Sequence, residues 1–391
     1  MDDEGIRVRS YRAMRITVPE DTGRVRVVQA PAEGDVKLAI EADRVAPEHR
    51  QWFCFDAHGD VDRERVIVLE NAGETTYADA LEEYRVCASY EPEGPDWFRV
   101  DTEMADGQLR IIHTPRQELV RYAYFAPYPR ARRNRVIEEA RASGRARLKR
   151  LGKSVEGRSM DLLTFGSDSE DAMKLWVIAQ QHPGETMAGW FAEGLIGRLL
   201  SSEDPLVLAL LEHARVNVIA CMNPDGATLG NHRTNAVGKD LNRSWWEASA
   251  EESPEVLAVR KALYDDGVDF FLDVHGDEHT PYVFIAGAEG NPHYNDRIEA
   301  LEDEFTNALL EASSDFQTEE GYPKDAPGKG DLRCAGNYAG EAFDCLSLTL
   351  EMPFKDNDNA PDPERGWSPE RSMKLAGDVV EAVAGVLDIL R

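Results

Sequence analysis

Cysteine is scarce in this sequence, and its few residues form no recognisable motif. There are five cysteines, an odd number, and no two of them are spaced as CxxC. This pattern argues against a disulfide framework and against a cysteine-based metal site. We therefore expect reduced, buried thiols at Cys54, Cys87, Cys221, Cys334 and Cys345.

Long hydrophobic runs are also absent. No stretch approaches the ~18 apolar residues that a membrane-spanning helix needs. The first fifteen residues, MDDEGIRVRSYRAMR, carry acids where a secretory signal peptide needs positive charge, and no apolar segment follows them. We expect a cytoplasmic protein with no membrane partner.

Positive charge is in short supply. Lys and Arg number 44 against 73 Asp and Glu, which gives a net charge of −29. Such an excess disfavours nucleic acid and anionic membranes as partners, because both are negatively charged. The composition suits a salt-adapted host and an acidic mesophile alike, and leaves both open.

The length predicts two domains, because a single core stops growing at roughly 250 to 300 residues. In residues 1–125, short β-prone runs separated by turn residues predict an antiparallel β-sandwich. These runs are 36–42, 65–69, 85–90 and 109–112. We place the second domain at 126–391, after a boundary marked by prolines.

The boundary continues into a basic stretch, 130–153, in which ten of 24 residues are Lys or Arg. Two interpretations stay open. The stretch is either a solvated helix face that neutralises neighbouring acids or an electrostatic guide for an acidic substrate tail.

From residue 151 onward, β-prone and helical segments alternate. The expected strands are 162–165, 175–179, 216–221, 270–274, 282–286 and 346–350, and the expected helices are 186–200, 254–265, 294–312 and 369–390. This α/β alternation predicts a mixed, mainly parallel sheet with helices on both faces.

The segment 175–188, LWVIAQQHPGETMA, is the most informative one. Its apolar run ends at two glutamines, and His182-Pro-Gly-Glu185 follows. Side chains at the carboxyl end of a strand lie in the crevice where open α/β sheets bind ligands. His and Glu are good zinc ligands, and Pro-Gly between them favours a tight turn. The spacing alone is weak evidence, since His275 and His293 also have an acid three residues on.

Three further stretches strengthen this interpretation. They are 223–226, Asn-Pro-Asp-Gly, running to 239–243, Lys-Asp-Leu-Asn-Arg; 272–276, Leu-Asp-Val-His-Gly; and 348–352, Leu-Thr-Leu-Glu-Met. Together with HPGE they resemble the zinc metallocarboxypeptidases, in particular the bacterial form of the cytosolic carboxypeptidase branch. The motifs cover the chain from about Tyr124, and the N-terminal part matches in general layout.

The resemblance implies a role for each motif residue. It implies one zinc ion per chain, bound by His182, Glu185 and His275, and two His plus one carboxylate meet the ligand count of a catalytic zinc. It also implies that the catalytic residues are Glu351, as the base, and Arg233, facing the oxyanion, and that Asn242 and Arg243 bind the substrate's terminal carboxylate. A tyrosine that the family carries on a mobile loop stays unassigned, because neither Tyr322 nor Tyr338 falls at a suitable spacing.

Several alternatives stay open. Asp277, Glu278 and His279 could form a rival ligand set with His275, and either arginine could pair with Asp240 or Glu247 instead of substrate. At the level of function, the partners implied are peptide or protein C-termini. The alternatives are a zinc amidohydrolase acting on small N-acyl amino acids and a non-catalytic peptide-binding module.

The loop before Glu351 also suggests a specificity. In the family this loop lines the pocket for the terminal side chain, and here Lys324, Lys329 and Arg333 lie in it, partly offset by Asp325 and Asp331. A basic group in that pocket would favour an acidic C-terminal residue.

Overall fold

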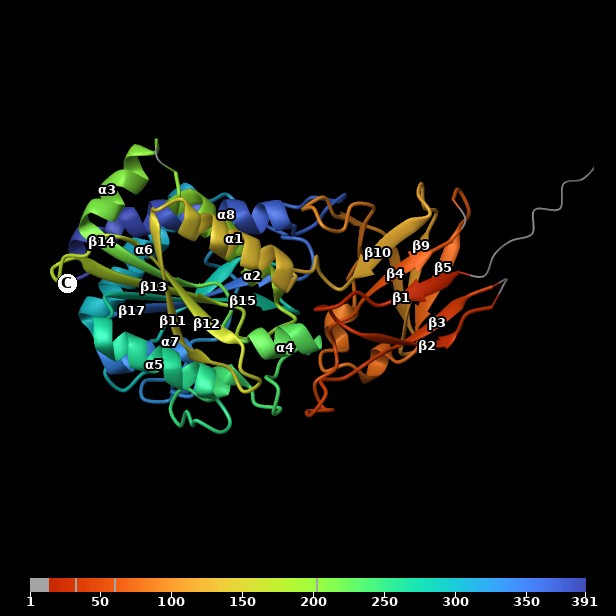
Figure 1. Cartoon of the computed structure of the whole chain (residues 1–391), viewed down its shortest axis with the longest axis horizontal. Helices are drawn as coiled ribbons and strands as arrows, with labels where there is room; N and C mark the ends of the chain where they lie inside the picture. The colour runs from red at the N-terminus through yellow and green to blue at the C-terminus, as the bar shows by residue number, and fades with distance from the viewer. Residues whose placement is uncertain (1–13, 32–33, 60, 202) are drawn as a thin grey trace, which may run out of the picture.

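The computed structural model describes residues 14–31, 34–59, 61–201 and 203–391 of the chain. Residues 1–13 lie outside the described residues. They make up most of the fifteen-residue N-terminal stretch that we expected to lack the features of a signal peptide. Figure 1 shows a smaller, strand-rich part formed by the first third of the chain beside a larger part in which helices surround a sheet.

The N-terminal part contains two five-stranded sheets. In spatial order, the first consists of β1 (Arg15–Thr17), β4 (Cys54–His58), β10 (Leu119–Ala123), β6 (Cys87–Ser89) and β7 (Phe98–Arg99). The second consists of β2 (Val25–Gln29), β3 (Val36–Ile40), β5 (Arg65–Leu69), β9 (Gln108–His113) and β8 (Asp101–Ala105). All pairings are antiparallel except that of β3 with β5.

The two sheets bury their apolar side chains in a shared core. Leu38 and Ile67 of the second sheet and Phe55 and Tyr122 of the first belong to the same buried cluster. The four runs expected from the sequence fall on β3, β5, β6 and β9. Two short 3₁₀ turns, η1 (Ala72–Glu74) and η2 (Asp79–Leu81), lie between β5 and β6 in the chain.

A seven-stranded sheet forms the centre of the larger part. In spatial order it consists of β11 (Ala146–Lys153), β12 (Ser159–Gly166), β14 (Ala214–Ile219), β13 (Met173–Ala179), β15 (Phe270–Asp277), β17 (Leu346–Pro353) and β16 (Phe284–Ala286). The four strands from β14 to β17 are parallel, and the three outer pairings are antiparallel. The sheet is therefore mixed, as expected, with its parallel strands at the centre.

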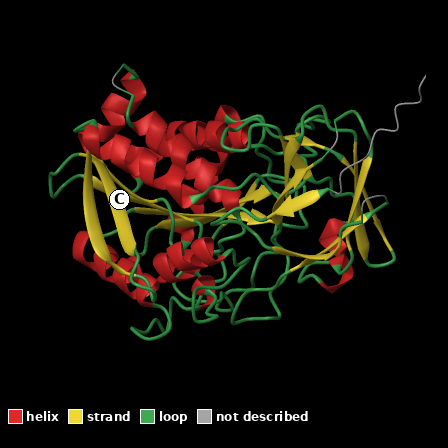
Figure 2. Ribbon diagram, turned by 45° about the vertical axis from the view of Figure 1, so that its right-hand side comes forward, coloured by secondary structure: helices red, strands yellow, loops and turns green. Residues whose placement is uncertain are grey.

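Helices cover both faces of this sheet (Figures 1 and 2). They are α1 (Arg130–Ala142), α2 (Thr186–Leu199), α3 (Pro205–His213), α4 (Pro224–Leu229), α5 (Pro254–Asp266), α6 (Asp296–Ala312), α7 (Ala335–Phe343) and α8 (Pro369–Val386), with the 3₁₀ turns η3 (Leu241–Arg243) and η4 (Leu387–Ile389). The residues of α2, α6 and α8 pack in one apolar core and those of α5 and α7 in a second. Because both faces are covered, every residue of β15 is buried.

Some elements differ from the expectations. The last helix ends at Val386 and continues as η4 instead of running to residue 390. Strand β11 and helices α3, α4 and α7 were not expected. The signals for α3 are visible in retrospect, because Asp204 caps it through hydrogen bonds to the N–H groups of Leu206 and Val207 and Pro205 is its first residue.

The basic stretch 130–153 occupies α1 and β11, and its side chains mainly pair with acids. Arg132 binds Glu193, Arg141 binds Glu138 and Arg147 binds Asp168, with N–O distances between 2.7 and 2.8 Å. These pairs support the first of the two interpretations, in which the stretch neutralises neighbouring acids.

All five cysteines are free. Four of them are buried, as expected, whereas Cys334 is half-buried. None of the helices in the described ranges is long and apolar enough to cross a membrane.

Candidate metal centre and active site

Two of the candidate ligands, His182 and Glu185, lie in the turn between β13 and α2. Gln180 adopts a left-handed conformation with φ of 56°, which redirects the chain where β13 ends. The N–H of Glu185 donates to the carbonyl of His182 across Pro183-Gly184. A side chain at Gly184 could not be accommodated, because its Cβ would lie 2.6 Å from Nδ1 of His232. The turn therefore aims both side chains the same way.

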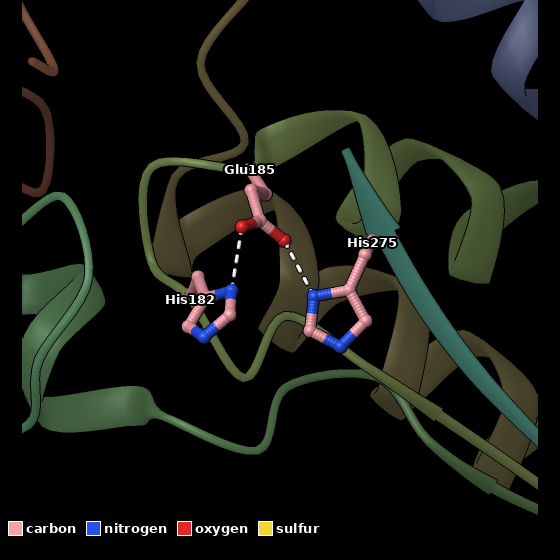
Figure 3. A group of neighbouring side chains, drawn as sticks. All are labelled: His182, Glu185 and His275. Atoms are coloured by element: carbon pink, nitrogen blue, oxygen red, sulfur yellow. Dashed lines mark hydrogen bonds and ion pairs between the residues drawn. The ribbon is translucent and has the colours of Figure 1, made fainter. Parts of the chain in front are cut away.

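The third candidate, His275, comes from the adjacent strand β15. In Figure 3 the carboxylate of Glu185 lies between the two imidazole rings. Its Oε1 is 2.5 Å from Nδ1 of His182, and its Oε2 is 2.7 Å from Nδ1 of His275. All three residues are buried, and one potential ligand atom from each lies within 4.8 Å of the others. No other group of three or more such residues gathers in this way among the residues described.

Carboxylates also fix the far side of both rings. Nε2 of His182 lies 3.1 Å from Oδ1 of Asp240, and Nε2 of His275 lies 2.8 Å from Oδ2 of Asp273. Such partners orient an imidazole and leave its other nitrogen, here Nδ1, facing the ligand position.

The charges of this group are strongly coupled. Burial alone would raise the pKa of Glu185, but the adjacent His182 and His275 outweigh it and hold that pKa well below its ordinary value. Burial opposes the charged form of His275, yet Asp273 and Glu185 raise its pKa well above the usual range. The group can therefore keep a buried carboxylate ionised beside positive charge.

Glu351 lies beside this group on β17, where it pairs in register with His275. It is buried, and its Oε2 has no hydrogen-bond partner among the described residues. Burial raises the pKa of Glu351 well above its ordinary value, and the carboxylates of Glu185 and Asp277 act in the same direction, while His275 opposes them. A carboxyl group of this kind can both accept and return a proton.

Tyr322 contacts Glu351 directly, which the sequence did not reveal. Its Oη lies 2.7 Å from Oδ2 of Asp277 and 3.2 Å from Oε1 of Glu351. A hydroxyl has one proton to donate, so both contacts are hydrogen bonds only when one of the carboxyl groups is protonated. The raised pKa of Glu351 agrees with this arrangement.

The residues expected to bind substrate surround the same space. Arg233 donates from Nε to Oδ2 of Asp240 at 2.8 Å, so it pairs with Asp240 while still lining the cavity. Arg243 donates from Nη1 to the carbonyl of Asn242 at 2.7 Å. Asn242 places its Nδ2 3.3 Å from Nε2 of His275 and accepts from the N–H of Ala335.

The candidate ligands, Glu351 and the residues expected to bind substrate line one cavity of about 770 Å³. Its walls include His182, Glu185, His275, Glu351, Arg233, Asn242, Arg243, Tyr322 and Tyr77. Lys324 also lines it, whereas Lys329 and Arg333 do not. The guanidinium of Arg333 instead pairs with Asp331 at 2.7 Å.

The cavity holds further acidic groups beyond the candidate ligands. Glu289, Glu302 and Asp303 line it together with Lys324. Burial raises the pKa of Glu302 to about 7, repulsion from Glu289 acts in the same direction, and a hydrogen bond from Tyr294 and the charge of Lys324 oppose both. This end of the cavity therefore carries a net excess of carboxyl groups.

The rival ligand set does not assemble around His275. His279 is about half exposed and its Nε2 lies 3.1 Å from Asp79. Glu278 instead faces Nε2 of His232 at 3.1 Å, and Asp277 accepts the hydroxyl of Tyr322.

The chain resembles known proteins along nearly its whole length. The profile of the zinc carboxypeptidases matches residues 136–373, and that of the cytosolic carboxypeptidase N-terminal domain matches residues 16–125. An uncharacterized protein of Zymomonas mobilis is 40% identical over 96% of this chain and 97% of its own length. Mouse cytosolic carboxypeptidase 6 is 25% identical over 85% of this chain and 66% of its own length.

The fold is also similar to that of solved structures. A metallo-carboxypeptidase from Pseudomonas aeruginosa, in complex with (2-guanidinoethylmercapto)succinic acid, is 45% identical, with a TM-score of 0.92 over 96% of this chain and all of the other.

Proposed function

Because the chain belongs to the zinc carboxypeptidase family, we propose that it removes C-terminal residues from peptides or proteins with His182, Glu185 and His275 as zinc ligands and Glu351 as general base. The observation that carries this proposal is the placement of Glu351, a buried carboxyl group with a free oxygen, in register with His275. The family is one of metallopeptidases, so the reaction class is hydrolysis of a peptide bond.

The donor set fits a catalytic zinc ion. Two imidazole nitrogens and one carboxylate are the ligands that leave one position open for water. The carboxylates of Asp240 and Asp273 behind the two rings provide the support that such ligands need. When bound, zinc would polarise the substrate carbonyl and lower the pKa of water.

The remaining residues supply binding and proton transfer. Glu351 takes a proton from the attacking water and delivers it to the leaving amine, a role for which its buried carboxyl group beside the candidate ligands is placed. Arg243 and Asn242 hold the terminal carboxylate, and Arg233 donates to the carbonyl oxygen on which negative charge develops. Tyr322, next to Glu351, donates a hydrogen bond to the substrate backbone or to Glu351 itself.

The domain division after residue 125 belongs to the same proposal. It is supported by the two family profiles, which stop and start on either side of it, and by the separate sheets of the two parts. The cytoplasmic location stays a prediction, in keeping with the name of the mouse relative.

The preference for acidic C-terminal residues also stays a prediction. Of the three basic residues on which it depended, Lys324 alone lines the cavity. The carboxyl groups of Glu302 and Glu289 favour the opposite preference, for Lys or Arg, and the Pseudomonas aeruginosa ligand carries a guanidino group. The two preferences differ in the charge of the terminal side chain and can be separated directly.

A peptide panel tests the function and the specificity together. Peptides matched except for a terminal Glu, Asp, Lys, Arg, Phe or Leu, and the N-acyl derivatives of the same amino acids, are incubated with the zinc-loaded protein and followed by mass spectrometry. We expect stepwise loss of single C-terminal residues, with Glu351→Gln as the inactive control. Hydrolysis of N-acyl amino acids alone would indicate the amidohydrolase, and binding without cleavage the peptide-binding module.

A further inference from the structure

Two residues of the N-terminal part, Asp43 and Tyr77, are hydrogen-bonded to Arg233 in the candidate active site. On the basis of the proposed function, in which Arg233 faces the substrate carbonyl, we propose that Asp43 and Tyr77 are positioning residues for Arg233. Neither residue belongs to the motifs of the catalytic part, and each lies more than 150 positions from Arg233 in the sequence.

Asp43 anchors the backbone of the loop that carries Arg233. Its carboxylate accepts hydrogen bonds from three consecutive N–H groups, those of His232, Arg233 and Thr234, and a fourth from Oγ1 of Thr234. The last two are 2.8 Å long. Asp43 is only 4% exposed, so these bonds replace the water that its charge has lost.

The same loop also contacts the HPGE turn, which carries two of the candidate metal ligands. The carbonyl of His232 accepts a hydrogen bond of 2.8 Å from the N–H of Gly184, which lies between His182 and Glu185. The loop is thus fixed between the N-terminal part on one side and the HPGE turn on the other. A shift of either neighbour would move the Cα of Arg233.

Tyr77 holds the other end of the Arg233 side chain. Its Oη accepts a hydrogen bond of 3.1 Å from Nη1, while Nε is bound to Asp240. The Tyr77 backbone is in turn fixed by Gln51, whose side chain accepts from its N–H and donates to its carbonyl. Among the described residues nothing accepts a hydrogen bond from Nη2 of Arg233, so this group is available to a ligand of the cavity.

These contacts give the arginine one orientation before substrate arrives. A guanidinium on a flexible side chain stabilises a developing oxyanion effectively only if its position is fixed in advance. Asp43 fixes the backbone, and Tyr77 and Asp240 fix two of the guanidinium nitrogens. The N-terminal part therefore acts in catalysis as well as in packing.

Two substitutions test this inference. Asp43→Asn keeps the shape of the side chain but turns an amide group toward N–H donors, and Tyr77→Phe removes only the hydroxyl. We expect kcat to fall about 10- to 100-fold in Asp43→Asn and about 3- to 10-fold in Tyr77→Phe, less than the ~10²- to 10³-fold loss of an oxyanion donor itself. Zinc content and KM should change by less than about threefold.

A double-mutant cycle separates positioning from stability. If both residues act through Arg233, neither substitution should lower kcat further in an Arg233→Ala background, because coupled residues are not additive. Asp56→Asn is the matched control, since Asp56 is a half-buried carboxylate of the same part, paired with Arg121 at 2.6 Å away from the cavity. It should leave kcat unchanged in both backgrounds.

Amide hydrogen exchange provides a readout that does not depend on activity. The amides of residues 232–234 should exchange at least ~10-fold faster in Asp43→Asn than in the parent or in Asp56→Asn.

The inference is overturned if these exchange rates are unchanged, or if Asp43→Asn and Tyr77→Phe lower kcat by the same factors with and without Arg233. It is also overturned if Arg233→Ala alone retains full kcat, a result that leaves the proposed function standing. The proposed function fails separately, if Glu351→Gln cleaves peptides as fast as the parent.

Discussion

At the scale of the residue, the candidate ligands lead to a test of zinc binding. His182→Ala and His275→Ala each remove one of three ligand groups, so zinc bound per chain should fall from one to well below one. The fold should persist, because the cores of both parts are built from apolar residues elsewhere. Elemental analysis after gel filtration, together with circular dichroism, measures both outcomes. Stoichiometric zinc in both variants would refute the ligand assignment.

Glu351 gives the second prediction at this scale. Glu351→Gln keeps the shape of the side chain and removes its ability to accept a proton. We expect zinc and peptide binding to be retained while kcat falls by at least ~10²-fold, the usual effect of a positioned general base. Turnover near that of the parent would exclude Glu351 from this role.

Glu302 gives a prediction about pH. Its pKa is raised from 4.5 to about 7, so between these values the folded state holds a proton that the unfolded state releases. The contribution of Glu302 to the free energy of unfolding must therefore fall as pH rises through this window. Glu302→Gln removes this dependence on pH. The free energy of unfolding of the variant, measured relative to that of the parent, should therefore increase by about 1 to 3 kcal/mol between pH 4.5 and a pH above 7.

Urea denaturation between pH 5 and 8 measures this gain. Glu304→Gln is the control, because it makes the same change at an exposed position of the same helix. A gain that does not depend on pH would show that Glu302 is not protonated in the folded state.

At the same scale, the sequence predicted which side chains would lie together. His182, Glu185, His275 and Glu351 each follow an apolar run, and in parallel strands such positions meet at one edge of the sheet. Tyr322 is different, since it lies on a loop of no regular period and reaches Glu351 across 29 positions. Asp43 and Tyr77 contact Arg233 across two separate parts of the chain, which no local pattern encodes.

At the scale of the element, α2 leads to a test of helix packing. A Cβ at Gly194 would lie 2.4 Å from the carbonyl oxygen of Met373 on α8, whereas a Cβ at Gly197 would meet nothing within 4 Å. Gly194→Ala should therefore destabilise the protein by about 1 to 3 kcal/mol, because backbone must move. Gly197→Ala should stabilise it by about 0.5 to 1 kcal/mol.

Urea unfolding of the two variants measures this difference. Both substitutions add one methyl group to the same helix, so each is the control for the other. Equal effects would mean that α2 and α8 do not approach as closely as described.

Elements were predictable where their pattern was periodic or β-branched. Strand β5 coincides with its predicted run, and α5 and α6 differ from theirs by one or two residues. Helix α7 was missed because AGNYAGEAF contains two glycines, which disfavour helices, and packing of Tyr338 and Ala339 stabilises it instead. Strand β11 was missed because its arginines and lysines mask the alternation.

At the scale of the whole molecule, the net charge of −29 leads to a test with salt. Self-repulsion destabilises the compact state, and the screening length falls from about 30 Å at 0.01 M to about 3 Å at 1 M. The melting temperature should therefore rise between these concentrations of KCl. Exposed ion pairs weaken over the same range, but each contributes only about 0 to 1 kcal/mol.

Differential scanning calorimetry in KCl and NaCl measures this rise. The two chlorides should act alike at equal ionic strength, and sulfate is avoided because it stabilises by exclusion from the surface. A flat or falling melting temperature would mean that the charges are already neutralised by local pairing.

The order of strands in the seven-stranded sheet has a consequence for biosynthesis. The chain leaves the ribosome from its N-terminus, so β13 and β15, which bring in the three candidate zinc ligands, precede β17, which carries Glu351. In the folded sheet, β17 lies between β15 and β16. On the proposed assignment, a nascent chain can acquire its metal before it has its base, so metal loading and the onset of proteolysis are separated in time.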